Sequence, residues 1–134
     1  MSQKHRHIIV VDDEAPMRGL LHDFFHTLGY QVECFSTGGA VLKRLQENNA
    51  TVSAVIADIR MTPMNGMELL QKVKATYPTL PVVLITSAGG PKQRDEAMKH
   101  GALHYLTKPF SLSELEIIVD KVTPEPDPGR NRNK

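Results

Sequence analysis

Short apolar runs and longer amphipathic stretches alternate five times along the chain. The first apolar run is Ile-Ile-Val-Val, and its β-branched residues face both sides of an extended chain, which is typical of a strand buried on two faces. The stretch that follows repeats large apolar residues at helical spacing as far as Leu28, and Gly29 supplies a C-terminal stop. The runs predicted as strands lie at 8–11, 32–35, 54–57, 82–85 and 103–106, and the stretches predicted as helices lie at about 17–28, 38–48, 66–76, 91–100 and 111–122.

Regular alternation of strand and helix predicts an α/β fold. We expect a doubly wound, five-stranded parallel sheet with right-handed crossovers and helices on both faces. The C-terminal ends of all the strands then lie at one edge of the sheet, where ligands bind in folds of this class. The polar residues at that edge therefore carry the candidate chemistry.

Acidic residues follow two of the predicted strands. Asp12, Asp13 and Glu14 come after the first strand, and Asp58 comes after the third. Each has an ordinary structural explanation when considered alone. The helix dipole favours the first three acids in the first turn of a helix, and Asp58 could simply begin a turn. Gathered at one edge, carboxylates repel by about 4 kcal/mol per pair at about 4 Å and an effective dielectric near 20. A divalent cation relieves this repulsion, and all-oxygen ligands favour Mg²⁺.

Hydroxyl and amino groups follow the fourth and fifth predicted strands at this edge. Thr86 and Ser87 end the fourth strand, and Lys108 ends the fifth, just before Pro109. Singly, the hydroxyls would satisfy loop amides and the lysine would be solvated. Beside a cation held by acids, an ammonium and a hydroxyl can bind the remaining oxygens of a phosphoryl group. The combination predicts phosphoryl transfer onto a carboxylate.

These motifs together resemble the receiver domain of two-component response regulators, the group that includes the chemotaxis response regulators. The resemblance covers residues 5–122, and its specificity lies in the joint spacing of several motifs. They are Val-Val-Asp12-Asp13-Glu14, then Asp58 followed by Met61 and Gly66, then Leu-Ile-Thr86-Ser87, then Gly101-Ala102, Tyr105 and Lys108-Pro109-Phe110. The resemblance implies a flavodoxin-like sheet with strand order 2-1-3-4-5.

The resemblance also implies a role for each acid. Asp58 would accept a phosphoryl group from the phosphohistidine of a histidine kinase. Asp13, Asp58 and the main-chain carbonyl of Arg60 would coordinate Mg²⁺, and Asp12 would act through a bound water. The domain would then be a signalling switch that catalyses only its own phosphorylation and dephosphorylation.

Three further residues would carry the switch. Lys108 would pair with Asp58 and afterwards with the phosphoryl oxygens, and Thr86 would move to hydrogen-bond those oxygens. Tyr105 would follow by turning inward, repacking the face made by the fourth helix, fifth strand and fifth helix as a two-state element. The resemblance further implies a cis bond between Lys108 and Pro109, which only about 5–6% of X–Pro bonds adopt.

The chain departs from the family pattern in the loop after Asp58. Thr62 separates Met61 from Pro63, where the family commonly places proline directly after the methionine, so we expect a local change of loop conformation. Arg60 and Ala88 occupy the positions that tune phosphoryl lifetime in this family. Because Ala88 cannot orient an attacking water and Arg60 can cover the phosphoryl group, we expect slow self-dephosphorylation.

Composition is that of one ordinary domain of 134 residues, with 40% hydrophobic and 23% charged residues. Residues 1–122 are expected to form the receiver domain, and 123–134, which are rich in proline, a flexible tail or linker. A net charge of +1 gives no general footprint for nucleic acid or a membrane surface. The single cysteine, Cys34, is expected to be a small buried apolar residue. Because the sequence shows no export signal or membrane segment, a cytoplasmic location is expected.

Partners follow from the resemblance: a sensor histidine kinase or phosphotransfer protein upstream, and a downstream protein or a C-terminal effector domain. Receivers that dimerise like those of winged-helix transcription factors usually carry acidic residues just before the aromatic residue of the fifth strand. Leu103 and His104 occupy that stretch here, so the sequence does not support this mode of dimerisation.

Other functions stay open at this point. A Mg²⁺-dependent phosphohydrolase would need a cap that these short connections do not provide. A flavin mononucleotide module would need a hydroxyl- and glycine-rich loop where Asp12, Asp13 and Glu14 stand. A receiver-like module that no longer takes phosphate is disfavoured by the joint presence of the site residues.

The six histidines give no zinc motif. His22 and His26 are one helical turn apart, but they lie off the apolar stripe and are expected on a solvated face. His5 and His7 are expected near a frayed start of the chain.

Overall fold

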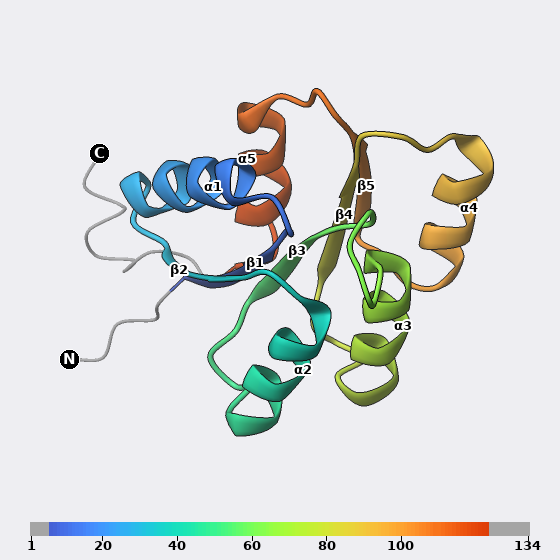
Figure 1. Ribbon diagram of the computed structural model, residues 1–134. Helices are drawn as coiled ribbons and strands as arrows, with labels where there is room; N and C mark the ends of the chain where they lie inside the picture. The colour runs from blue at the N-terminus through green and yellow to red at the C-terminus, as the bar shows by residue number, and fades with distance from the viewer. Residues whose placement is uncertain (1–5, 124–134) are drawn as a thin grey trace.

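The computed structural model describes residues 6–123 and shows five strands alternating with five helices (Figure 1). The predicted tail therefore lies almost wholly outside the described residues. Every predicted element is present, with ends that differ by at most two residues. The elements are β1 His7–Val11, α1 Ala15–Thr27, β2 Gln31–Phe35, α2 Gly38–Glu47, β3 Ala54–Asp58, α3 Gly66–Thr76, β4 Val82–Thr86, α4 Pro91–Lys99, β5 His104–Thr107 and α5 Leu112–Asp120.

All neighbouring strands are parallel, in the order β2-β1-β3-β4-β5. β1 lies between β2 and β3, so that Val10 pairs with Cys34 on one side and with Ile56 on the other. The strand order and the doubly wound architecture are confirmed. The change of winding direction at β1 opens a crevice beyond the C-terminal ends of β1 and β3.

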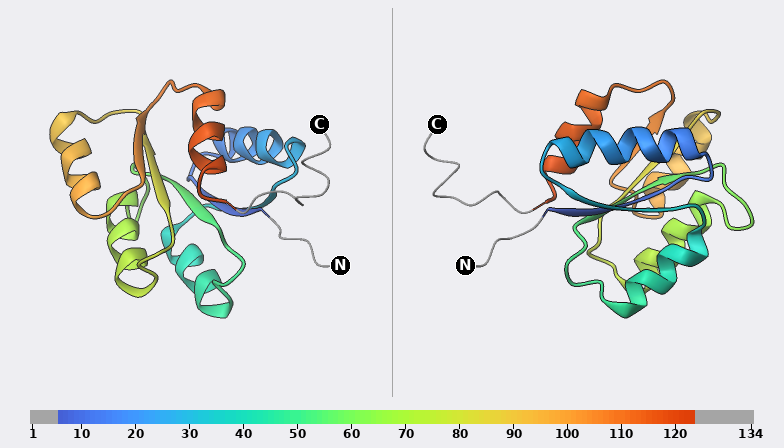
Figure 2. Two further views of the ribbon diagram at one scale, coloured as in Figure 1. Left: turned by 180° about the vertical axis from the view of Figure 1, so that it is seen from behind. Right: turned by 60° about the vertical axis from the view of Figure 1, so that its left-hand side comes forward.

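Two cores lie on opposite faces of the sheet because successive strand residues point to opposite sides. Ile9 and Val11 face the core shared with α2, α3 and Ala97 of α4. Ile8 and Val10 face the core shared with α1 and α5. Figure 2 shows α1 and α5 on one side of the sheet and α2 and α3 on the other.

Burial on both faces, predicted for the runs of uncharged β-branched residues, holds for the three inner strands, and the two edge strands are less buried. β1, β3 and β4 are buried throughout, whereas β2 is half-buried and β5 is exposed at both ends. Edge strands have a neighbour on one side only, so the helices cover them incompletely. Cys34 on β2 is accordingly half-buried, and burial raises the pKa of its thiol.

The expectation that His7 lies near a frayed start of the chain is wrong. His7 is the buried first residue of β1. Its Nε2 lies 2.6 Å from Glu33 Oε2, and its Nδ1 lies 3.2 Å from Thr51 Oγ1. Arg44 binds the same carboxylate through Nε and Nη2 at 2.8 and 2.9 Å, which helps to hold the pKa of Glu33 below its ordinary value. The polar atoms of the buried imidazole are thus paired, as burial requires.

Candidate functional site

A cavity of about 430 Å³ opens at the C-terminal edge of the sheet, where the sequence placed the chemistry. The residues around it come from the segments after β1, β3 and β4 and from the end of β5. They are Asp13, Glu14, Asp58, Arg60, Ser87 and Lys108. The strand ends therefore bring together residues that are far apart in the chain.

Asp58 is the last residue of β3 and is buried, with 3% of its surface exposed. Its Oδ1 accepts a hydrogen bond of 2.9 Å from the main-chain N–H of Arg60, and its Oδ2 accepts one of 3.1 Å from Lys108 Nζ. The backbone behind it is closely packed, because a Cβ atom at Gly66 would lie 2.5 Å from the carbonyl oxygen of Asp58. α3 can begin here only with a residue that has no side chain.

Lys108 points from the end of β5 into the acid group. Its Nζ lies 3.1 Å from Asp58 Oδ2, 3.6 Å from Asp12 Oδ2 and 4.0 Å from Glu14 Oε1. Burial lowers its pKa, but the hydrogen bond to Asp58 and the three carboxylate charges outweigh burial and raise the pKa of Lys108 above its usual value. The lysine is therefore held in its charged form.

The peptide bond between Lys108 and Pro109 is cis, as the resemblance implied. The bond between Thr62 and Pro63 is also cis, in the loop where the proline position departs from the family pattern.

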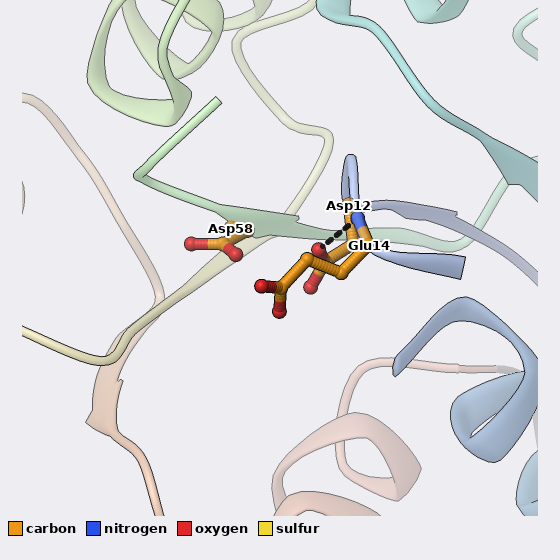
Figure 3. Close-up of side chains that lie close together, drawn as sticks. All are labelled: Asp12, Glu14 and Asp58. Atoms are coloured by element: carbon orange, nitrogen blue, oxygen red, sulfur yellow. Dashed lines mark hydrogen bonds between the residues drawn. The ribbon is translucent and has the colours of Figure 1, made fainter. Parts of the chain in front are cut away.

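Asp12 is fully buried at the end of β1. Its Oδ1 accepts a 2.9 Å hydrogen bond from the main-chain N–H of Glu14, whereas Oδ2 is buried without a hydrogen-bond partner in the described part of the chain. Burial raises the pKa of Asp12 to about 6, with the charge of Asp58 adding to the rise and the Glu14 N–H opposing it. Figure 3 shows Asp12, Glu14 and Asp58 converging, and one carboxylate oxygen of each lies within 4.8 Å of the others.

This donor set fits a divalent cation. Three carboxylates face one lysine, and the unpaired Asp12 Oδ2 is a buried oxygen that lacks a proton donor. Hard oxygen donors and excess negative charge are what Mg²⁺ prefers. The resemblance implies Asp13 as a metal ligand; in the structure Asp13 and Glu14 are both exposed at the cavity wall, and Glu14 also belongs to the close cluster.

Thr86 and Tyr105 are not among the residues that line this cavity. The hydroxyl of Thr86, which is fully buried, donates to the Ala88 carbonyl at 2.8 Å and accepts from the Ala88 N–H at 3.2 Å. Tyr105 is 7% exposed, and its hydroxyl donates to Gln93 Oε1 at 2.8 Å. Sequence reasoning did not identify Gln93, because a glutamine in a charged helix belongs to no motif.

The histidine pair on α1 lies away from the cavity. The rings of His22 and His26 stack with centroids 5.4 Å apart, and the His22 side chain is 42% exposed, in agreement with the predicted solvated face. None of the helices within residues 6–123 combines the length and the apolar character needed to cross a bilayer.

Comparisons with known proteins show which proteins this chain resembles. Residues 8–120 match the family described as response regulator receiver domain. The chain is 33% identical over 123 residues to the transcriptional regulatory protein FixJ of Bradyrhizobium diazoefficiens, a match that spans 92% of the chain and 59% of FixJ. It is also 33% identical over 112 residues to the DNA-binding transcriptional regulator NtrC of Klebsiella pneumoniae, covering 84% of the chain and 24% of NtrC. The chain thus spans only part of these longer relatives.

Solved structures show the same fold. A receiver domain protein from Clostridium thermocellum superposes with a TM-score of 0.82 at 29% identity, covering 87% of the chain and 92% of its own length. The chemotaxis protein CheY4 of Vibrio cholerae superposes with a TM-score of 0.79 at 26% identity, covering 88% and 98%.

Proposed function

Since the chain belongs to the response regulator receiver domain family, whose members signal by phosphorylation, we propose that Asp58 is its phosphoryl acceptor. The observation that carries this is the contact of Asp58 Oδ2 with Lys108 Nζ at 3.1 Å at the wall of the cavity, with the unpaired Asp12 Oδ2 buried 3.6 Å from the same Nζ. The donor is the phosphohistidine of a sensor histidine kinase or a phosphotransfer protein.

The transfer needs one nucleophile and one leaving group. A carboxylate oxygen of Asp58 forms a P–O bond as the P–N bond to the donor imidazole breaks, and the imidazole keeps the bonding electron pair and takes up a proton. Lys108 then moves its hydrogen bond from the carboxylate to an oxygen of the phosphoryl group. Thr86 reaches another of these oxygens by releasing Ala88, which its hydroxyl binds in the present structure.

Magnesium would be held by oxygens of this same cavity. The proposed ligands are Asp13, Asp58 and the main-chain carbonyl of Arg60, with Asp12 through a water; the clustering of Glu14 with Asp12 and Asp58 adds a further candidate. When bound, Mg²⁺ neutralises the charge that builds up on the phosphoryl oxygens. The chain's own part is to orient Asp58 through the Arg60 N–H and to supply the positive charge of Lys108.

The output would be a change on the face formed by α4, β5 and α5, with Tyr105 as its switch. A downstream protein or a C-terminal effector domain would recognise this face, as the greater lengths of FixJ and NtrC allow. The domain is a signalling domain, and we propose that the only reactions it catalyses are its own phosphorylation and dephosphorylation. Arg60 and Ala88 would make the dephosphorylation slow. We further propose that the receiver domain comprises residues 1–122 and that the protein is cytoplasmic.

Intact-mass measurement tests the acceptor. The protein is incubated with acetyl phosphate and Mg²⁺, and the mass of one phosphoryl group should be added. This mass should not appear when a chelator removes Mg²⁺ before the donor is added, nor in Asp58→Asn. Asp13→Asn serves as a second variant that keeps the acceptor and removes a proposed metal ligand, so it should label slowly. Labelling that persists in Asp58→Asn would overturn the assignment.

A further inference from the structure

The hydroxyl of Tyr105 occupies a space that exists only because residue 89 is glycine. A Cβ atom built at Gly89 would lie 1.8 Å from Tyr105 Oη, 3.1 Å from Tyr105 Cζ and 2.6 Å from Gln93 Oε1. No side chain fits at these distances while Tyr105 stays in place. Gly89 does not have a positive φ, so the need for glycine here is one of space and not of backbone conformation.

The same hydroxyl links two elements that otherwise share little. Tyr105 belongs to β5, and Gln93 lies in the first turn of α4, so their 2.8 Å hydrogen bond joins strand to helix. Of the residues in α4, only Ala97 is buried. In Figure 1 α4 lies at the β5 end of the sheet, and little apolar packing holds it there.

The loop that holds Gly89 is also attached to the proposed phosphoryl site. Thr86 binds both the N–H and the carbonyl of Ala88, the residue immediately before Gly89. If the Thr86 hydroxyl turns toward a phosphoryl group on Asp58, both of these hydrogen bonds break. The backbone beside the Tyr105 hydroxyl is then free to move.

We propose that Gly89 and Gln93 are positioning residues that form a seat for Tyr105 and hold α4 against β5 before Asp58 carries a phosphoryl group. The seat gives the chain a resting state in which Tyr105 is already buried, so the switch would begin from this seat and not from the outward tyrosine that the resemblance implies. Movement of Thr86 reaches α4 through Ala88, Gly89 and the Tyr105 hydroxyl. The role of the seat in signalling rests on the proposed function. The seat itself rests only on the contacts of Tyr105 with Gly89 and Gln93.

Chemical accessibility of Tyr105 tests the seat without phosphorylation. Tetranitromethane nitrates exposed tyrosines, and peptide mass spectrometry reports Tyr30, Tyr77 and Tyr105 separately. In wild type Tyr105 should react slowly, and Gly89→Ala should speed its nitration by about tenfold or more, because the added Cβ displaces the ring toward solvent. Tyr30, which is buried in the other core, should be unchanged and reports that the variant is folded.

Gly90→Ala is the matched control. Gly90 has an extended backbone, and a Cβ there would meet nothing within 4 Å, so this variant should nitrate like wild type. Gln93→Leu removes the acceptor and keeps the size of the side chain, and it should speed Tyr105 nitration roughly two- to tenfold, as the loss of one hydrogen bond allows. If Gly89→Ala and Gln93→Leu both leave Tyr105 as slow as in wild type, the seat is overturned.

A phosphorylation arm separates the seat from the proposed function. In wild type, acetyl phosphate with Mg²⁺ should change the nitration rate of Tyr105, and Asp58→Asn should abolish that change. If Gly89→Ala speeds the nitration of Tyr105 but the wild-type protein gains no phosphoryl mass, the seat is supported and the assignment of Asp58 as acceptor is refuted. Phosphate uptake with no change in Tyr105 reactivity would refute the link from Thr86 to the seat.

Discussion

Lys108 Nζ donates a 3.1 Å hydrogen bond to Asp58 Oδ2 across fifty positions of sequence. The contact is possible because β5 and β3 are parallel and flank β4, so their C-terminal ends face the same crevice. It places one positive charge among three carboxylates, with Asp12 and Glu14 at 3.6 and 4.0 Å.

Replacing Lys108 with methionine should slow phosphorylation of Asp58 by about 100-fold, the usual effect of removing one group that stabilises transition-state charge. The measurement is the rate of phosphoryl mass gain with acetyl phosphate at saturating Mg²⁺. Lys43→Met, an exposed position on α2, is the control and should label at the wild-type rate. Equal rates for the two variants would contradict the role of Lys108.

Asp12 should make the folded protein less stable as pH rises. Its pKa is raised from 3.8 unfolded to about 6 folded, so the folded state binds more protons between these values. The free energy of unfolding should therefore fall between about pH 4 and pH 6 in metal-free buffer and level off above, by on the order of 2 kcal/mol from this residue. Urea denaturation across this range measures it.

Asp12→Asn is the matching variant, since it keeps the shape and loses the charge. It should flatten the fall in stability between about pH 4 and pH 6 and be more stable than wild type at pH 7 without metal. An unchanged pH profile in Asp12→Asn would assign the effect to another group.

Gly66→Ala should destabilise the fold by about 1–3 kcal/mol, because its Cβ would lie 2.5 Å from the Asp58 carbonyl oxygen and would push α3 away from the site. Gly39→Ala, in α2 with nothing within 4 Å of the added atom, should instead stabilise by about 0.5–1 kcal/mol. Thermal and urea unfolding compare the two. A Gly66 variant as stable as wild type would show that the close packing behind Asp58 relaxes easily.

Ala88→Glu should shorten the lifetime of the phosphoryl group by about tenfold or more, because a carboxylate at this exposed position can orient an attacking water. The hydrogen bonds of Thr86 to the backbone of residue 88 do not depend on its side chain and should remain. The decay of the phosphorylated mass after removal of the donor gives the lifetime. Arg60→Asn should act in the same direction, and if neither variant loses phosphate faster than wild type, the lifetime hypothesis is wrong.

Some of the site could be read directly from residue spacing. Asp58, Thr86 and Lys108 each follow a predicted strand, and in a parallel sheet the ends of all strands meet at one edge. Their convergence therefore followed from chain order once alternation was recognised. The cis bond before Pro109 came from the family resemblance and not from any local pattern.

Other parts of the site could not be read in this way. Which of the neighbouring acids joins the cluster depends on the path of the chain after β1: Asp13 and Glu14 are both exposed at the cavity wall, but only Glu14 has a carboxylate oxygen in the close cluster with Asp12 and Asp58. The Tyr105 contact with Gln93 depends on the approach of α4 to β5, which no sequence period encodes.

The alternation of apolar runs and amphipathic stretches was enough to establish the parallel α/β sheet, because a chain with this pattern can bury its strands only beneath helices on both faces. Tertiary packing decided what periodicity leaves open: the burial of His7 in β1, the exposure of the edge strands, and the unpaired Asp12 oxygen beside Lys108. Periodicity fixes which face of an element is apolar. Contacts between individual side chains depend on distances of a few ångströms between elements that meet only in the folded chain.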